Sequence, residues 1–270
     1  MSAPDPHNGK TAARERLRAE RARQATKDKR RRRLLAATAM AGLLAVVGTT
    51  AYLVVQANEP TAWEAAKTAK LVEPAHTTGP DGTTVVLGKA DAPKTLKVYE
   101  DMRCPFCATF EQAVGPSVDK DLESGKYKVQ YVIGTFLDNP GEGSRNALSA
   151  LGAALNVSPD AFLAYKQELF SAKYHPQESE DTFKSDKYLI QVADQVSALK
   201  DNAAFRKAVT DGTYDRWALE MSEKFTTNED GATGTPTLVM DGRKLTTADG
   251  ATPLTAAAYE DAIGKALAGK

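Results

Sequence analysis

The sequence contains little cysteine and little histidine, with 2 cysteines and 3 histidines among 270 residues. Secreted proteins that depend on disulfides for stability carry several cysteines at wide spacing, so a multi-disulfide scaffold is excluded. A structural zinc site needs four ligands, usually cysteine or histidine. Beyond the cysteines only His7, His76 and His175 are available, in three different segments. We therefore expect no metal ion.

The formal net charge of the whole chain is zero, but this value is the sum over segments of opposite net charge. Lys+Arg and Asp+Glu both number 35. Residues 1–33 hold 12 basic and 4 acidic residues, and residues 34–55 hold no charged residue. The rest of the chain has the remaining 23 basic and 31 acidic residues, a net charge of −8 against +8 for the first 33. This polarised pattern is typical of a chain that crosses a membrane, and not of a neutral soluble protein.

The uncharged run from Leu34 to Val55 predicts a transmembrane helix. Its 22 residues would span about 33 Å as a helix, and the hydrocarbon core of a bilayer is about 30 Å thick. The basic run 30–33 directly before it is typical of the cytoplasmic side. We therefore expect a single-pass anchor in the cell membrane, with a cytoplasmic tail over 1–33 and an extracytoplasmic remainder. A cleaved signal peptide is the alternative, although its apolar region is usually only about 7–15 residues long.

Two short segments lack the residues that nucleotide or nucleic-acid binding requires. The basic tail over 1–33 contains no Phe, Trp or Tyr that could stack on a base, so we expect an orienting tail and no nucleic-acid partner. The glycine-containing segment 141–144 lacks the lysine and the spacing of a phosphate-binding loop. It is interpreted as a turn that enters a helix.

The extracytoplasmic part begins with residues 56–81, which are rich in Ala, Thr, Pro and Gly and predict a linker with one short helix over 63–70. The domain that follows is expected to cover residues 82–270. Its first half alternates strand and helix signals, with strands at 83–87, 95–100 and 127–133 and a helix over 104–123. This order predicts a strand–helix–strand unit with parallel strands.

The middle of this domain is predicted to be a helical insertion over about 144–225. The expected helices cover 144–155, 159–170, 184–199 and 203–224, with Ser144 and Ser158 as N-caps of the first two. A strand, an Asp-Gly turn and a second strand then predict a hairpin over 234–245. Thr255 is expected to cap a last helix that ends near residue 267. The fold class is therefore α/β.

The two cysteines form the motif Cys104-Pro105-Phe106-Cys107 at a strand-to-helix junction. A disulfide between them would close a very short loop, and loop-entropy stabilisation is weakest for short loops. Its use must therefore lie in being formed and broken. A helix N-terminus stabilises a thiolate, so we expect Cys104 to be the exposed attacking thiol and Cys107 the buried resolving one. Pro105 suits the first helical turn because it has no amide hydrogen to leave unpaired.

The stretch GKADAPKTLKVYEDMRCPFC, together with the distant Gly234-Thr235-Pro236-Thr237, resembles the DsbA-like thiol:disulfide oxidoreductases of the thioredoxin superfamily. The resemblance runs from about residue 83 to the C-terminus. It implies a thioredoxin-like fold with a helical insertion and no cofactor besides a redox-active Cys104–Cys107 disulfide. It also implies a cis Pro236 that faces the attacking sulfur, with substrate contacts from Thr235, Pro105 and Phe106.

Two positions depart from the family pattern. Strongly oxidising relatives carry a histidine where this chain has Phe106, and relatives often carry a buried carboxylate where this chain has Val98. Glu100 and Asp101 are the nearest carboxylates, and either one could substitute or simply face water at the end of the strand. Arg103 is expected to favour the Cys104 thiolate, whereas the two carboxylates oppose it.

The function expected from these residues is an extracytoplasmic thiol:disulfide oxidoreductase, with oxidation of substrates favoured because that compartment is oxidising. Expected partners are unfolded or reduced secreted proteins and a membrane protein that reoxidises the cysteine pair. Three alternatives stay open. One is a reductase or isomerase of the same fold, and another is a non-enzymatic, membrane-anchored, thioredoxin-like binding module. The third is a dedicated role in cytochrome or copper-centre assembly, which shares the chemistry but differs in substrate.

Overall fold

The structure is a computed structural model that describes residues 16–21, 23–33, 38, 61–139 and 141–269. The chain divides into two compact units, Met1–Pro60 and Thr61–Lys270. In the first unit, residues 16–21 and 23–33 are helical and exposed. The predicted transmembrane helix lies outside the described residues except for Thr38, and it stays a prediction. None of the helices within the described ranges is both long enough and apolar enough to cross a bilayer.

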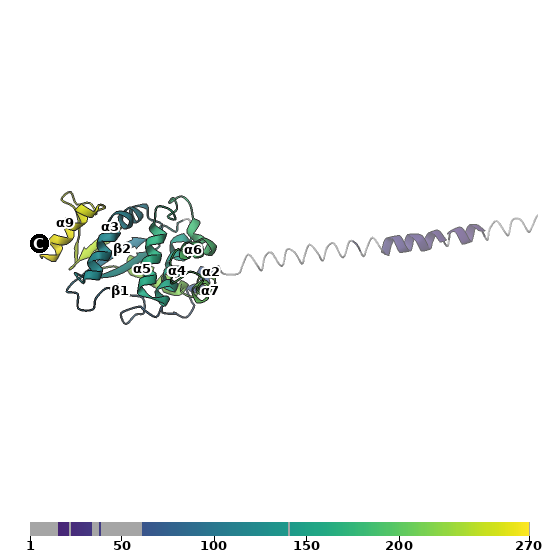
Figure 1. The fold of residues 1–270 in the computed structure, drawn as a ribbon. Coiled ribbons are helices and arrows are strands. Elements are labelled where there is room, and N and C mark those ends of the chain that lie inside the picture. The colour runs from purple at the N-terminus through teal and green to yellow at the C-terminus, as the bar shows by residue number, and fades with distance from the viewer. Residues whose placement is uncertain (1–15, 22, 34–37, 39–60, 140, 270) are drawn as a thin grey trace, which may run out of the picture. The chain divides into compact units, whose positions relative to one another are not determined.

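The second unit is built on a mixed five-stranded sheet in the order β1-β3-β2-β4-β5 (Figure 1). The strands are β1 Val85–Leu87, β2 Thr95–Asp101, β3 Lys128–Gly134, β4 Thr237–Met240 and β5 Arg243–Lys244. β2 and β3 run parallel, which confirms the predicted crossover, and the other neighbouring pairs are antiparallel. The thioredoxin-like α/β fold with many helices is therefore confirmed.

Side chains alternate along the central strands between two apolar layers. Leu96 and Val98 of β2 belong to the main core. Tyr99, the next residue along β2, faces the opposite side of the sheet and packs with Val132 and Phe225. Glu100 is two residues from Val98, so the same alternation directs its carboxylate toward the main core. The face of the sheet that each β2 residue occupies thus decides which groups reach the cysteines.

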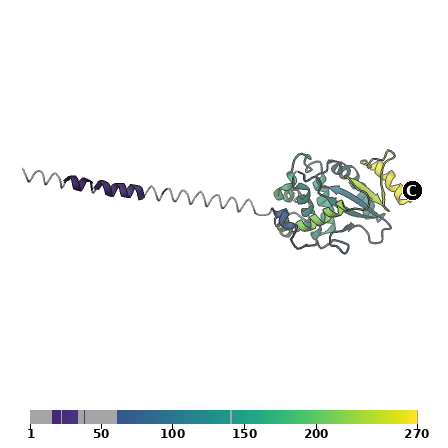
Figure 2. The same cartoon turned by 180° about the vertical axis from the view of Figure 1, so that it is seen from behind.

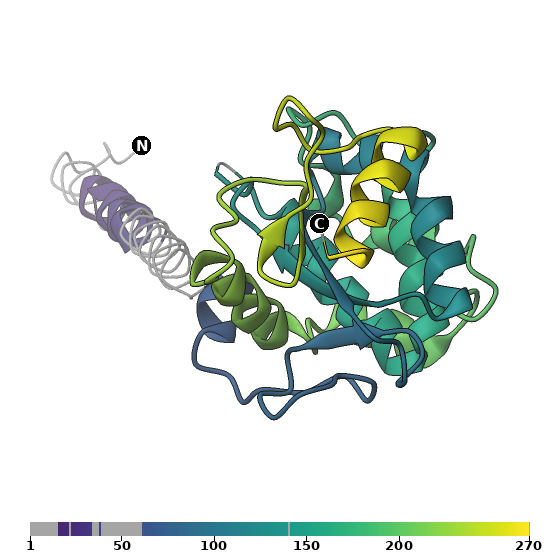
Figure 3. The same cartoon turned by 90° about the vertical axis from the view of Figure 1, so that its left-hand side faces the viewer.

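Helices cover both faces of this sheet. α3 (Pro105–Ser124) and α9 (Ala256–Leu267) lie side by side on the main core (Figure 3). α8 (Asp215–Thr226) packs against β3 on the other face, seen from behind in Figure 2. α3 ends where Gly125 adopts φ 80°, a conformation that favours glycine, and Thr255 caps α9 as predicted.

The remaining helices lie toward the other end of the domain from α9 (Figure 1). They are α4 Gly143–Val157, α5 Pro159–Phe170, the 3₁₀ turn Thr182–Lys184, α6 Asp186–Ala193 and α7 Ala203–Thr210. Ser158 caps α5 as predicted. The predicted helix over 203–224 is wrong in its continuity, because Gly212 at φ 61° forms a turn that separates α7 from α8. The helix predicted over 184–199 is also too long, since α6 ends at Ala193.

Residues 61–81 belong to the compact unit, so the prediction of a linker over 56–81 does not hold from residue 61 onward. The short helix α2 (Ala62–Ala66) inserts Trp63 into the core, where only 4% of it is exposed. The backbone N–H of Ala75 donates to the Asn156 side chain. The composition of this segment is that of a linker, but one buried tryptophan ties it to the domain.

Substitution of Trp63 tests this packing. We expect Trp63→Ala to lower the free energy of unfolding by about 3–5 kcal/mol, because it removes a large buried side chain from the core. Val72→Ala is the matched control in the same segment, since Val72 is 41% exposed, and it should change stability by less than about 0.5 kcal/mol. Urea unfolding of the full chain measures both, and equal small effects would restore the linker interpretation.

Candidate active site

Both cysteines lie at the start of α3, directly after β2. Cys104 is the N-cap residue of α3, and its backbone N–H donates to the carbonyl oxygen of Asp101 at 3.0 Å. Pro105 occupies the first helical position as predicted, and Cys107 lies one turn into the helix. The helix N-terminus therefore directs its partial positive charge at the Cys104 sulfur.

The cysteines are free thiols, and both are buried. Cys107 is fully buried, as predicted, but the prediction of an exposed Cys104 is wrong because only 5% of it is accessible. The segment around Thr235 covers it, with the Thr235 carbonyl oxygen 3.5 Å from Cys104 Sγ. Only a small part of the Cys104 residue is therefore exposed to a second molecule.

The covering segment is held against the central strand. The Thr235–Pro236 peptide bond is cis, as the resemblance implied. Thr237, the next residue, is paired with Tyr99 of β2. The Thr252 hydroxyl donates to the Pro236 carbonyl oxygen at 3.0 Å. The structure thus brings together Cys104, Cys107, Thr235 and Pro236, four of the predicted site residues.

The environment of the two thiols separates their pKa values. A hydrogen bond from the Cys107 thiol is the largest cause that lowers the pKa of Cys104 to about 6, although burial opposes it. The Thr235 side chain also lowers that pKa, and its hydroxyl has no hydrogen-bond partner among the described residues. Burial raises the pKa of Cys107 well above its ordinary value, and the neighbouring Cys104 and Glu100 add to this. Cys104 is therefore the thiolate and Cys107 its proton-bearing donor.

This separation favours the reduced state of the pair. The folded pKa of Cys104 lies below the ordinary value of 9.0, so the thiolate stabilises the folded reduced chain. That contribution is complete above about pH 9 and is lost as the pH falls through about 6. The disulfide form has no thiolate to stabilise, so a low pKa of Cys104 shifts the equilibrium toward the dithiol.

The two residues between the cysteines face solvent. Pro105 is exposed, and 62% of Phe106 is exposed, which is unusual for a large apolar side chain. Their position beside Cys104 makes them available to a bound polypeptide.

Glu100 lies beneath the cysteines, so the possibility that it faces water is wrong. It is fully buried, and its carboxylate accepts from Lys166 Nζ of α5 at 3.1 Å. The same ammonium group is 2.6 Å from Glu111 of α3, and it lies 4.7 Å from the centre of the Tyr131 ring. Burial raises the pKa of Glu100, with Lys166 opposing and Glu111 adding to the rise. Burial also opposes the charge of Lys166, but the two glutamates outweigh it and raise its pKa.

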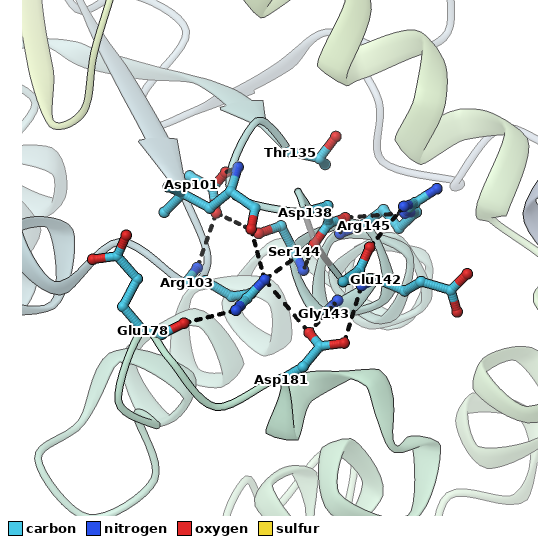
Figure 4. Close-up of polar contacts among 12 residues, drawn as sticks. Asp101, Arg103, Thr135, Asp138, Glu142, Gly143, Ser144, Arg145, Glu178 and Asp181 are labelled. Carbon is cyan, nitrogen blue, oxygen red and sulfur yellow. Dashed lines mark hydrogen bonds and ion pairs between the residues drawn. The ribbon is translucent and has the colours of Figure 1, made fainter.

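Asp101 and Arg103 are also buried, and neither acts on the Cys104 thiolate as predicted. The Arg103 side chain donates to carbonyl oxygens at residues 137 and 178, and its charge is not among the largest causes of the low Cys104 pKa. Burial raises the pKa of Asp101 to about 6. The Asp101 carboxylate accepts from Ser144 Oγ, so Ser144 is not the N-cap predicted for α4 (Figure 4).

Sequence reasoning missed Glu111 and Lys166, although each had a signal. Glu111 follows Cys107 by four residues, which places both on one face of a helix. Lys166 shares a helix face with Phe162, Leu169 and Phe170, so it is a charge on an otherwise apolar stripe. The sequence did not indicate that these two residues contact Glu100, because only tertiary packing brings β2, α3 and α5 together.

Titration of the reduced full chain tests the assigned pKa values. We expect the ultraviolet absorbance of the Cys104 thiolate to rise with a midpoint near pH 6. Cys107→Ala removes the thiol donor and should raise the midpoint by about one unit, whereas Cys107→Ser keeps a hydroxyl donor and should keep it low. A wild-type midpoint near the ordinary value of 9.0 would contradict the geometry.

Comparisons with known proteins agree with this site. A family model described as thioredoxin matches residues 80–264. The chain is 27% identical over 163 residues to the serine/threonine-protein kinase PknE of Mycobacterium tuberculosis, which is 58% of this chain and 28% of the kinase. It is 36% identical over 86 residues to disulfide bond formation protein D of Bacillus subtilis, which is 32% of this chain and 37% of that protein. The chain thus spans well under half the length of these relatives.

The solved structure of oxidised BdbD from Bacillus subtilis superposes with a TM-score of 0.58 at 21% identity, and the match covers 73% of this chain and 100% of that one. MdbA from Corynebacterium diphtheriae, a thiol-disulfide oxidoreductase, superposes with a TM-score of 0.56 at 20% identity, covering 75% of this chain and 100% of that one. At this level of identity the likeness concerns the fold. Together with the matched family and the paired cysteines at a helix N-terminus, it shows that the chain belongs to the thioredoxin family.

Proposed function

We propose that this protein is a DsbA-type thiol:disulfide oxidoreductase that acts outside the cytoplasm, chiefly as an oxidant of protein thiols. One observation carries the proposal: Cys104 is a stabilised thiol at a helix N-terminus, paired with a buried Cys107 and covered by the Thr235–Pro236 segment. The similarity to disulfide bond formation protein D and to solved thiol-disulfide oxidoreductases supports it.

The exchange needs no reagent beyond the two disulfide partners. A substrate thiolate attacks Cys104 Sγ, the Cys104–Cys107 bond breaks, and Cys107 leaves as a thiolate. A second substrate thiolate attacks the substrate sulfur of this mixed disulfide, and Cys104 leaves as a thiolate. The substrate loses two electrons and gains one disulfide, and the enzyme gains the two electrons as a dithiol. The low pKa of Cys104 makes it the better leaving group in the second step.

The proton that Cys107 needs comes from Glu100 in this proposal. Cys107 has no solvent access, and its leaving thiolate has a high proton affinity. Burial raises the pKa of Glu100, which favours a protonated carboxyl group close enough for its charge to affect Cys107. Proton transfer leaves a Glu100 carboxylate 3.1 Å from Lys166, which stabilises it. Glu111, whose side chain is slightly exposed, connects the buried group toward solvent.

The proposed direction is oxidation, and the proposed place is the outer side of a membrane. The low pKa of Cys104 supports the oxidising direction, because it stabilises the reduced cysteine pair. Phe106 argues against strong oxidising power, because it carries no charge that would stabilise the thiolate. The place is supported by the uncharged run 34–55 behind a basic tail. Unfolded or reduced secreted proteins would be the substrates, and a membrane protein would reoxidise the cysteine pair.

Reaction with a reduced two-cysteine peptide tests the activity. The disulfide form of the full chain should oxidise the peptide in stoichiometric amounts, and Cys104→Ser should abolish the reaction. Cys107→Ala cannot form the disulfide and should also fail to oxidise the reduced peptide. With the oxidised peptide its Cys104 thiolate should instead form a mixed disulfide and release one peptide thiolate, and no Cys107 thiol is present to release Cys104. An inert wild-type chain would favour the binding-module alternative. A reduction potential near about −270 mV instead of about −120 mV would assign the chain to the reductants.

The role of Glu100 has a separate test. We expect Glu100→Gln to slow peptide oxidation by about 10- to 100-fold and to flatten its dependence on pH, because the variant cannot deliver a proton to Cys107. Asp215→Asn is the matched control, since Asp215 is another buried carboxylate of raised pKa but hydrogen-bonds to Ser149. Stopped-flow measurements from pH 5 to 9 decide, and a wild-type profile in Glu100→Gln would remove Glu100 from the mechanism.

A further inference from the structure

A buried network of charges lies behind the active-site turn, on the side away from Glu100. We name it the Arg103 clamp, and it consists of Arg103 and the carboxylates of Asp101, Asp138 and Asp181 (Figure 4). It joins three segments that are far apart in the sequence: the turn 101–104, the loop after β3, and the loop before the 3₁₀ turn of the insertion.

The guanidinium of Arg103 occupies the centre of this network. Nη1 donates to the carbonyl oxygen of Leu137 at 2.6 Å, and Nη2 donates to that of Glu178 at 2.7 Å. Asp138 and Asp181 lie 3.7 and 3.5 Å from Nη1. A Cβ atom on Gly141 would come within 2.9 Å of Nη1, and Gly141 has φ 142°, so glycine is required beside the guanidinium.

The two outer carboxylates of the clamp also cap α4. Glu142 is the N-cap residue of this helix but makes no side-chain cap. Asp138 and Asp181 replace that cap by accepting from the free backbone N–H groups of Glu142, Gly143, Ser144 and Arg145. Arg103 lies near both carboxylates, and Arg145 pairs with Asp138 at 3.0 Å, so the two arginines offset the negative charge at the start of the insertion.

Asp101 connects the clamp to the cysteines. Its carboxylate accepts from the backbone N–H of Arg103 at 3.0 Å, from that of Leu137 at 3.1 Å and from Ser144 Oγ at 2.6 Å. Its own backbone carbonyl accepts from Cys104 N–H, and its backbone also hydrogen-bonds to Cys107. Leu137 is thus fixed at both ends, by Arg103 and by Asp101, and the turn that holds both sulfurs is fixed to the same loop.

We infer that Arg103 is a positioning residue, whose forked contacts to the carbonyl oxygens of Leu137 and Glu178 tie the active-site turn to the helical insertion and so hold Cys104 at its helix N-terminus. This inference rests on the proposed function only for its catalytic meaning, because the geometry of Cys104 can be measured without a substrate. It differs from an effect of charge on the thiolate, since the hydrogen bonds of the guanidinium go to the carbonyl oxygens of Leu137 and Glu178.

A lysine substitution separates positioning from charge. Arg103→Lys keeps a positive charge near Asp138 and Asp181, but a single ammonium group cannot reproduce the planar fork to two carbonyl oxygens. Arg103→Met removes both charge and fork. Arg145→Met is the matched control, because Arg145 also pairs with Asp138, at 3.0 Å, but has no contact with residues 101–104 among the described interactions.

The readout is the thiolate midpoint of Cys104 in each reduced full-length variant, followed by the rate of peptide oxidation. We expect both Arg103 variants to raise the midpoint by about one pH unit, which is about tenfold less thiolate below the midpoint. They should also slow peptide oxidation, because Cys104 becomes a poorer leaving group in the second step. Arg145→Met should lower stability but keep the wild-type midpoint. If Arg103→Met does not fold, the Cys104 midpoint of Arg103→Lys alone tests the positioning role.

Three results would overturn the inference. A wild-type midpoint in both Arg103 variants would make the clamp a purely structural element. A wild-type midpoint in Arg103→Lys with a raised one in Arg103→Met would assign the effect to charge. An equal shift in Arg145→Met would assign it to the stability of α4. Failure of the proposed function is seen separately, as a wild-type chain that titrates near pH 6 but oxidises no peptide.

Discussion

The hydrogen bond from the Cys107 thiol to the Cys104 sulfur is the interaction on which the proposed chemistry depends. It operates only if one sulfur keeps its proton and the other loses it, and burial enforces that difference. The start of α3 supplies the favourable field for Cys104, and the apolar core around Cys107 supplies the unfavourable one. Two thiols three residues apart thus become chemically unlike.

The helical insertion supports this pair from two sides. On one side α5 brings Lys166 to Glu100 under Cys107. On the other side the start of α4 and the loop at residue 181 surround Arg103 beside the turn that carries Cys104. A thioredoxin-like core without the insertion would have Glu100 and Asp101 on β2 but not Lys166 or Ser144, the partners that make their burial tolerable.

Much of the fold could be predicted from the sequence, because strand alternation, the Cys-Pro-Phe-Cys helix start and the capping residues are local signals. The partners of Glu100 could not, since Lys166 is 66 residues away and only tertiary packing joins them. The burial of Cys104 was missed for the same reason: its cover is Thr235, 131 residues further on. Residues 61–81 were misjudged because composition does not show that Trp63 finds a place in the core.

The cover over Cys104 has a consequence for the chemical durability of the protein. A thiolate at neutral pH is the form that peroxide converts to sulfenic and then to irreversible sulfinic acid, and susceptibility rises with exposure. Here the Thr235 segment leaves only 5% of Cys104 accessible. A peroxide molecule must reach the sulfur past this cover. Burial of Cys104 therefore slows irreversible oxidation of its thiolate.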